Sequence, residues 1–190
     1  PAKVARTSTA AGGQPRVAAE DELQESFDPA LEPATTIAYE SHDVVIDEPA
    51  ILTVGGERVN KLVRGRRYQY AYQARFSAPA DSVRFGMLIK TISGIDLGGA
   101  VSAASLAEAI PRVARGAVYH VVFQFTCSLN PGVYFLNAGV RGLRDETDTY
   151  LHRLLDAAMF RVQPESGSLS TGLVDFDCIP ELVIARHATA

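Results

Sequence analysis

The amino-acid sequence predicts an all-β fold, an antiparallel β-sandwich of about eight strands with one short helix and an extended N-terminal tail. Three observations lead to this fold class. From residue 36 onward, short apolar runs alternate with polar residues and are separated by turn residues. Hydrophobic residues make up 47% of the chain and charged residues 21%, as in globular domains. The sequence contains neither Gly-x-Gly nor Gly-Lys, so it lacks the phosphate-binding loops of nucleotide-binding α/β domains.

One domain and a tail account for the length. A chain of 190 residues removes roughly 70% of its unfolded surface from water and needs no metal or disulfide to fold. Residues 1–19 are rich in Ala, Gly and Pro, and residues 20–33 are acidic and contain two prolines. We therefore expect a flexible acidic linker over residues 1–35 and the sandwich over residues 36–190. Because the sequence begins without Met, we also expect it to be a piece of a longer chain.

The first strands are expected over residues 37–47, 51–54 and 66–77. The last of these, RRYQYAYQARFS, has the clearest alternation in the sequence. Side chains of a strand point alternately to its two faces, so the tyrosines at 68, 70 and 72 share one face, and Gln73 and Arg75 share the other. We expect the tyrosine face to be buried and the other face to be solvated.

Two hairpins follow. The strands over residues 83–90 and 95–97 are joined by Ser93-Gly94, where glycine tolerates the positive φ of a tight turn. Residues 117–126 and 133–141 are expected to form the second hairpin. Between the hairpins, residues 100–115 are rich in Ala and predict a connection.

The alternation stops at residues 145–156. Asp148 is a favourable helix N-cap, and Leu151, Leu154 and Leu155 lie at helical spacing, so this segment predicts the short helix. A strand over residues 158–162 and extended material over residues 173–185, broken by Pro180, complete the predicted sandwich.

Charge and hydropathy argue against nucleic acid and membrane insertion. Eighteen Lys and Arg residues against 22 Asp and Glu residues give a net charge of -4, which provides no positive field for a phosphate backbone. No segment reaches the roughly 20 apolar residues that span a bilayer, and the N-terminus has no signal-peptide core, so a cytoplasmic protein is expected. Cys127 and Cys178 are expected to be reduced thiols.

The sequence carries no strong catalytic motif. The four histidines are scattered, and neither cysteine has a second ligand at zinc spacing, so we expect no metal, no cofactor and no enzyme. Asp175-Phe176-Asp177 resembles the two-carboxylate element that holds a divalent cation beside a nucleotide sugar, which gives a carboxylate-dependent sugar transferase as a further reading. Two solvated carboxylates on one side of a strand explain this short motif better.

The polar face of the sheet is the best candidate for a binding site. Amide and guanidinium groups match vicinal hydroxyls, and an exposed aromatic ring offers a flat apolar surface for the C–H face of a sugar. A solvated sheet face without a ligand would carry similar residues, and this alternative stays open. The candidate glycan-binding residues are Gln73, Arg75, His120, Gln124, Phe135, Asn137 and Arg141.

The order and spacing of several segments resemble a known family. The resemblance covers about residues 27–163 and concerns the C-terminal carbohydrate-binding domain of the ATPase subunit of bacterial O-antigen polysaccharide ABC exporters, the Wzt type. The segments that carry it are the strand, Ser-Gly turn and strand of FGMLIKTISGIDL, the pattern F-x-F-x(3)-L-x-x-G-x-Y over residues 123–134, and LDAAMFRV at residues 155–162.

The resemblance implies an immunoglobulin-like β-sandwich that forms a homodimer by exchanging its C-terminal strand. It implies a non-catalytic domain that recognises the non-reducing end of a lipid-linked O-antigen polysaccharide at the inner face of the inner membrane and couples it to ATP-driven export. The implied partners are the polysaccharide and the nucleotide-binding and membrane subunits of the ABC transporter, with the ATPase on a separate domain. A ligand-free dimerisation module, or an accessory domain of a glycosyl- or methyltransferase, remains as an alternative.

Overall fold

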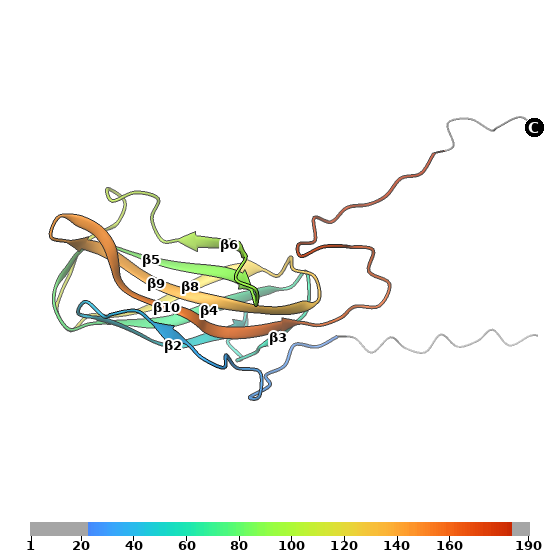
Figure 1. Ribbon diagram of the computed structural model, residues 1–190, viewed down its shortest axis with the longest axis horizontal. Coiled ribbons are helices and arrows are strands. Elements are labelled where there is room, and N and C mark those ends of the chain that lie inside the picture. Colours follow the sequence, from blue (N-terminus) through green and yellow to red (C-terminus); the bar gives the residue numbers. More distant parts are fainter. Residues whose placement is uncertain (1–22, 184–190) are drawn as a thin grey trace, which may run out of the picture.

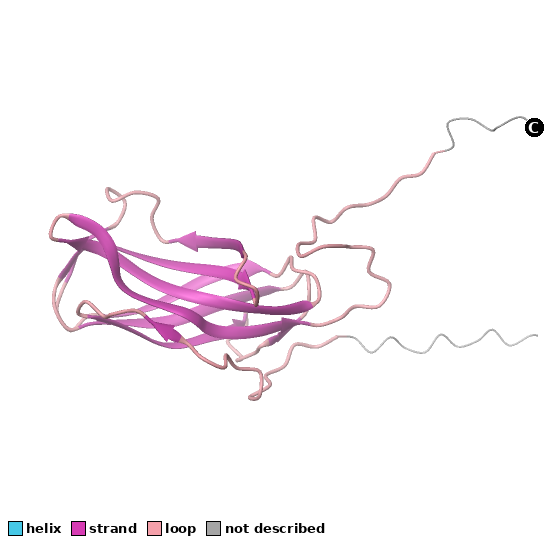
Figure 2. Ribbon diagram, in the orientation of Figure 1, coloured by secondary structure: helices cyan, strands magenta, loops and turns pink. Residues whose placement is uncertain are grey.

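A computed structural model describes residues 23–183, and within that range it contains strands and no helix (Figures 1 and 2). Over these residues there is accordingly no helix of the length and hydropathy needed to cross a membrane. The strands are β1 (Ile37–Ala38), β2 (Val44–Thr53), β3 (Lys61–Leu62), β4 (Arg67–Phe76), β5 (Ala80–Thr91), β6 (Asp96–Val101), β7 (Ile110–Val113), β8 (Val118–Thr126), β9 (Gly132–Arg144) and β10 (Thr147–Val162).

The strands form two sheets that pack face to face (Figure 1). The large sheet has the strand order β1-β10-β9-β5-β6, with β3 beside β10 and β7 beside β5. The small sheet has the order β2-β4-β8. Neighbouring strands are antiparallel except β3 and β10, which pair in parallel. The predicted all-β antiparallel sandwich is confirmed.

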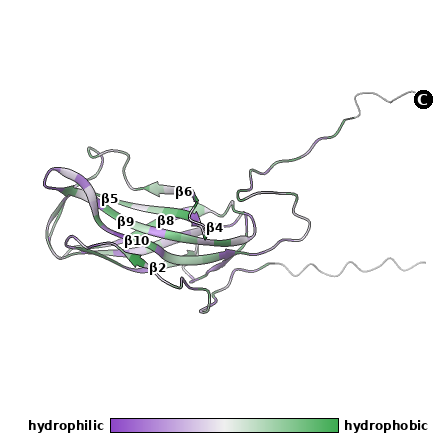
Figure 3. Cartoon of the chain, viewed as in Figure 1, coloured by the Kyte–Doolittle hydropathy of each residue, from purple (hydrophilic) through white to green (hydrophobic). Residues whose placement is uncertain are grey.

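Alternate residues of the facing strands build the core. In β4 the predicted inward face is confirmed, because Tyr68, Tyr70 and Tyr72 are all at most 2% exposed. From the large sheet, Tyr134 and Leu136 of β9 meet them in the same core cluster. Figure 3 shows apolar and polar residues alternating along the strands, as two-residue periodicity requires.

Tyr72 ties the two sheets together. Its hydroxyl donates to the carbonyl oxygens of Gly86 in β5, at 3.0 Å, and Gly139 in β9, at 3.2 Å. These glycines are direct cross-strand partners in the large sheet. The small sheet is therefore anchored to the large sheet at this glycine pair.

The helix predicted over residues 145–156 is wrong, because this segment forms a hairpin turn and most of β10. Asp145 and Glu146 have positive φ angles of 48° and 63°. Positive φ at both central residues is the conformation of a two-residue type I′ turn, which joins antiparallel strands. Asp148, expected as a helix cap, lies instead in β10.

Irregularities in β10 explain the misleading pattern. Its pairing with β9 shifts register between Tyr150 and His152, and again between Leu154 and Ala158. Extra residues at a bulge break the alternation of side chains. Leu151, His152 and Leu154 are consequently all buried, and the leucine spacing imitates that of a helix.

Residues 23–35 lie against the sandwich. Ser26 forms an antiparallel bridge with Lys61, and the Asn60 side chain donates to the carbonyl oxygens of Asp28, at 2.7 Å, and Leu31, at 3.0 Å. Most of the linker expected over residues 1–35 falls on residues 1–22, outside the described residues. The domain boundary at residue 36 stays a prediction.

After β10 the chain contacts the sandwich as far as Asp175 and then runs away from it (Figure 1). Val174 bridges Leu129 in an antiparallel arrangement, and no strand is assigned from residue 163 to residue 183. The last residues of the extended segment expected over 173–185 lie outside the described part. Cys127 is buried, Cys178 is exposed, and both are free.

Candidate functional site

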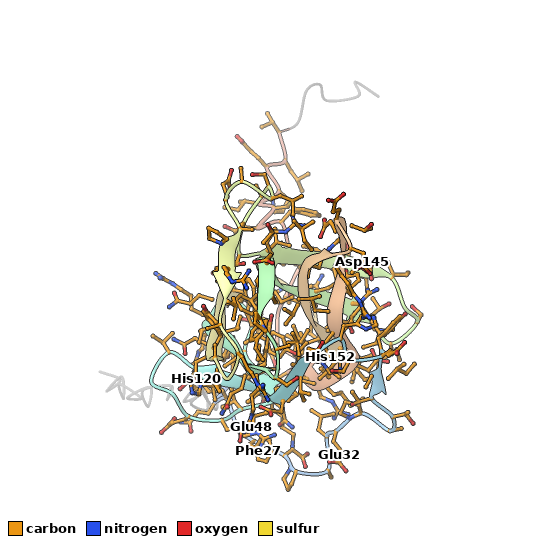
Figure 4. All side chains as sticks on the ribbon, turned by 90° about the vertical axis from the view of Figure 1, so that its left-hand side faces the viewer. Phe27, Glu32, Glu48, His120, Asp145 and His152 are labelled. Carbon is orange, nitrogen blue, oxygen red and sulfur yellow. The ribbon has the colours of Figure 1, made fainter. Side chains whose placement is uncertain are left out.

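The structure divides the candidate glycan-binding residues between the two outer faces of the sandwich. One group lies on the outer face of the small sheet, in β4 and β8, and consists of Gln73, Arg75, His120 and Gln124. The other group lies on the outer face of the large sheet, in β9, and consists of Phe135, Asn137 and Arg141. In Figure 4, His120 and Asp145, at the tip of the β9–β10 hairpin, lie on opposite sides of the molecule. A single glycan terminus cannot contact both groups.

On the small sheet, two candidate side chains already have protein partners. The Gln73 amide donates to the Glu48 carboxylate, and Arg75 Nε lies 2.7 Å from Asp47 Oδ2. His120 is exposed opposite Gln73, and Glu48 lies near it in Figure 4. An open groove of about 440 Å³ runs over this face, and its lining mixes apolar Ala, Leu and Val side chains with Glu48, Gln73 and His120. This arrangement is typical of a solvated sheet face.

On the large sheet, a pocket of about 230 Å³ has Gly86 and Gly139 at its floor, next to the side chains of Val101 and Tyr150. Gly86 of β5 and Gly139 of β9 are cross-strand partners, and their neighbours along each strand point into the core. Glycine within a strand commonly marks a place where a ligand approaches the backbone closely. This volume is below the roughly 300–1,000 Å³ of pockets for drug-sized ligands, so it suits one terminal sugar unit.

Charged side chains form one wall of this glycine-floored pocket. Arg84 Nη2 donates to Asp148 Oδ2 at 2.5 Å, and Arg141 Nη2 donates to the same oxygen at 3.0 Å. The hydrogen bond from Arg84, reinforced by Arg141, lowers the pKa of the Asp148 carboxyl below its ordinary value. The carboxylate therefore stays ionised and fixes both guanidinium groups.

Aromatic rings contact the guanidinium groups beside the pocket. The centroid of the Tyr150 ring lies 5.0 Å from the Arg141 guanidinium and 4.9 Å from that of Arg153. The Arg153 guanidinium also lies 5.6 Å from the ring of Tyr39. Stacking occupies the faces of a guanidinium and leaves the N–H groups at its edge available. Both arginines are thus held in place with donors at the pocket.

Asn137 and Phe135 extend the same face along β9. Asn137 is only 4% exposed, and its Oδ1 accepts a hydrogen bond from the Asp156 backbone N–H at 2.8 Å. Asn137 therefore lines the pocket, and its hydrogen bond to Asp156 also stabilises the second register shift between β9 and β10. Phe135 lies beyond the pocket, 5.8 Å from Lys90 Nζ, where its ring offers a surface for a second sugar.

Sequence reasoning found Asn137 and Arg141 and missed most of this site, namely Arg84, Gly86, Gly139, Tyr150 and Arg153. The two glycines carried a usable signal, because each interrupts an apolar strand without a turn residue beside it. Tyr150 and Arg153 were lost because their segment was expected to be helical. In the structure both residues belong to β10, where Tyr150 pairs with Arg141 and Arg153 pairs with Gly139 of β9.

The Asp175 carboxylate of the Asp175-Phe176-Asp177 motif is engaged in local structure. Asp175 Oδ2 lies 2.9 Å from Arg64, and Asp175 Oδ1 accepts a hydrogen bond from the Asp177 backbone N–H, which lowers the Asp175 pKa. Within residues 23–183, no group of three or more His, Cys, Asp or Glu side chains is placed to hold a metal ion.

Comparisons with known proteins agree with this architecture. The family model of the Wzt C-terminal domain matches residues 35–176. Among solved structures, a crystal structure of the C-terminal domain of Wzt superposes with a TM-score of 0.68 at 22% sequence identity, covering 80% of this chain and 92% of that chain. No curated protein matches the sequence.

Proposed function

The chain belongs to the Wzt C-terminal domain family, the carbohydrate-binding domains of O-antigen ABC transporters, and from this premise we propose that it recognises the non-reducing end of a lipid-linked O-antigen polysaccharide. The glycine-floored pocket on the outer face of the large sheet binds that terminus. The domain performs no catalysis itself and couples the bound polymer to ATP-driven export.

The pocket is the observation that carries this proposal. A pocket lined by two glycines, the Tyr150 ring, three arginines and an asparagine admits a sugar ring and supplies donors for its hydroxyls. A hydroxyl that reaches Asn137 or Arg141 replaces water there, and a sugar lacking the hydroxyl that reaches Asn137 would leave its buried amide donor unpaired. Binding of this kind distinguishes a terminal sugar unit from an internal one.

The proposed partners follow from the role in export. ATP hydrolysis takes place on a separate nucleotide-binding domain, and the membrane subunit of the transporter receives the polymer. The domain works at the cytoplasmic face of the inner membrane, where the lipid-linked polysaccharide is completed.

A homodimer formed by exchange of C-terminal strands is also part of the proposal. β8 ends the small sheet, so its outer edge has no neighbouring strand within the described residues. The C-terminal segment leaves beside that edge, since the Asp175 N–H donates to the Ser128 carbonyl oxygen at 2.7 Å. It then exposes apolar side chains that a partner sheet would cover, namely Phe176, Ile179, Leu182 and Val183.

Calorimetric titration tests the glycan-binding function. The ligands are an oligosaccharide with the non-reducing terminus of the source organism's O-antigen and an internal fragment of the same polymer. We expect binding of the terminal oligosaccharide only, and Gly86→Val should weaken it by about tenfold or more, equivalent to about 1.4 kcal/mol. The control is Gly55→Val, because an added Cβ atom makes ordinary van der Waals contacts at both positions. It would lie 3.6 Å from the Ala100 carbonyl oxygen at Gly86 and 3.5 Å from Thr53 Oγ1 at Gly55.

Two results would count against the proposal. Equal binding of both oligosaccharides would show that the terminus is not recognised. Binding of neither would favour a ligand-free dimerisation module. Gly55→Val lies in an exposed turn and should leave the affinity unchanged.

A further inference from the structure

The glycine-floored pocket contains more positive than negative charge. Three guanidinium groups line it, those of Arg84, Arg141 and Arg153. One carboxylate contacts them, that of Asp148, and it is shared between Arg84 and Arg141. The pocket is therefore positive although the chain as a whole has a net charge of -4.

Some arginines on other surfaces of the sandwich are neutralised by carboxylates. Arg75 pairs with Asp47, and Arg112 pairs with Asp81. Within residues 23–183, the Arg153 guanidinium forms no ion pair, and it lies against the rings of Tyr39 and Tyr150. Two rings hold this guanidinium in place while its charge and its donors remain uncompensated.

A guanidinium held in this way is suited to an anion. Its planar edge presents paired N–H donors whose geometry matches two oxygens of a carboxylate or phosphate. Because the rings already restrict the side chain, little conformational entropy is lost when the anion binds. Arg141 also lies over the Tyr150 ring, 5.0 Å from its centroid, and brings a second cation to the same pocket.

We propose that the terminal sugar unit bound in this pocket carries an anionic group, a carboxylate or a phosphate, which Arg153 binds with help from Arg141. This inference rests on the proposed function and specifies the chemical class of its ligand. The sugar ring lies over Gly86 beside the Tyr150 ring, and its anionic group points to the guanidinium groups of Arg141 and Arg153.

Three matched monosaccharides test the inference by amide chemical shifts of the 190-residue chain. They are methyl α-D-glucopyranoside, the corresponding methyl glucuronide and glucose 6-phosphate. We expect at least one anionic probe to bind about tenfold more tightly than the neutral probe, because a charge-assisted hydrogen bond is stronger than a neutral one. The glucuronide carries a carboxylate and glucose 6-phosphate carries a phosphate, so their relative affinities distinguish the two anions.

Variants identify the responsible cation. Arg153→Gln should remove the preference for the anionic probe, and Arg153→Lys should retain part of it because the charge remains. Arg67→Gln makes the same charge change on the outer face of the small sheet and should leave the preference unchanged.

The outcomes separate the inference from the proposed function. If all three probes bind equally and Arg153→Gln changes nothing, the anionic ligand is wrong while sugar binding stands. If none of the probes shifts the pocket amides, both are overturned.

Discussion

The Asn137 side-chain oxygen accepts a hydrogen bond from the backbone N–H of Asp156 at 2.8 Å, across a register shift between β9 and β10. This bond positions the strand that carries Tyr150 and Arg153 to the pocket. A residue expected to bind glycan therefore also shapes the binding site.

Asn137→Ala should lower the free energy of unfolding by about 1–2 kcal/mol, because the Asp156 N–H loses its acceptor. Urea denaturation followed by circular dichroism measures the change. Gln69→Ala is the control, since the side-chain amide of Gln69 faces outward in β4 and has no hydrogen bond within the described residues. Equal effects of the two substitutions would contradict the role assigned to Asn137.

Tyr72→Phe should lower the free energy of unfolding by about 1–2 kcal/mol, because its hydroxyl donates to Gly86 and Gly139 beneath the pocket. Tyr70→Phe provides a matched control in the same strand. The Tyr70 hydroxyl is buried and has no partner among the described residues, so its removal should be neutral or stabilising. A larger loss for Tyr70→Phe than for Tyr72→Phe would contradict this account.

Stability should fall in mildly acidic solution because of His152. Its Nδ1 accepts the backbone N–H of Ile46 at 3.0 Å, and burial lowers its pKa below the ordinary value. Folding favours the neutral imidazole of His152. Its contribution to the free energy of unfolding is therefore complete above the unfolded pKa of about 6.5 and is lost as pH falls through the lowered pKa of the folded state.

His152→Asn keeps an acceptor for Ile46 and cannot be protonated. As pH falls from about 6.5 to 5, the range below the ordinary histidine pKa, the wild type should therefore lose more unfolding free energy than His152→Asn. Thermal unfolding at closely spaced pH values measures it. Parallel pH profiles for the two proteins would refute the role of His152.

Removal of residues 176–190 should convert the proposed dimer into a monomer. The truncation keeps the Val174–Leu129 bridge and the Asp175–Arg64 ion pair but deletes the exposed apolar segment. Light scattering coupled to size-exclusion chromatography measures the mass over a range of concentrations. A full-length chain that stays monomeric, or a truncated chain that stays dimeric, would exclude strand exchange through this segment.

The sequence predicted the sandwich wherever alternation was uninterrupted. In β4, regular spacing of tyrosines identified the buried face correctly. In β10, bulges shifted the alternation, and the spacing of Leu151 and Leu154 indicated a helix that does not form. A local pattern cannot reveal a bulge, because the partner strand determines where the extra residue lies.

The candidate site was predicted in part for a related reason. Asn137 and Arg141 were assigned to a polar face, and they do line the pocket. The pairing of Gly86 with Gly139 depends on the register between β5 and β9, which side-chain alternation alone does not specify. The sequence also left open which outer face held which candidates, so residues on opposite sides of the sandwich were grouped together.

The most direct test of the account maps the glycan on the protein by ¹H–¹⁵N correlation spectroscopy during titration with the terminal O-antigen oligosaccharide. We predict that the largest shifts occur at the amides of Gly86, Gly139 and Arg141, with Arg153 affected as well. Shifts confined to Gln73, His120 and Gln124 on the small sheet would contradict the assignment of the pocket.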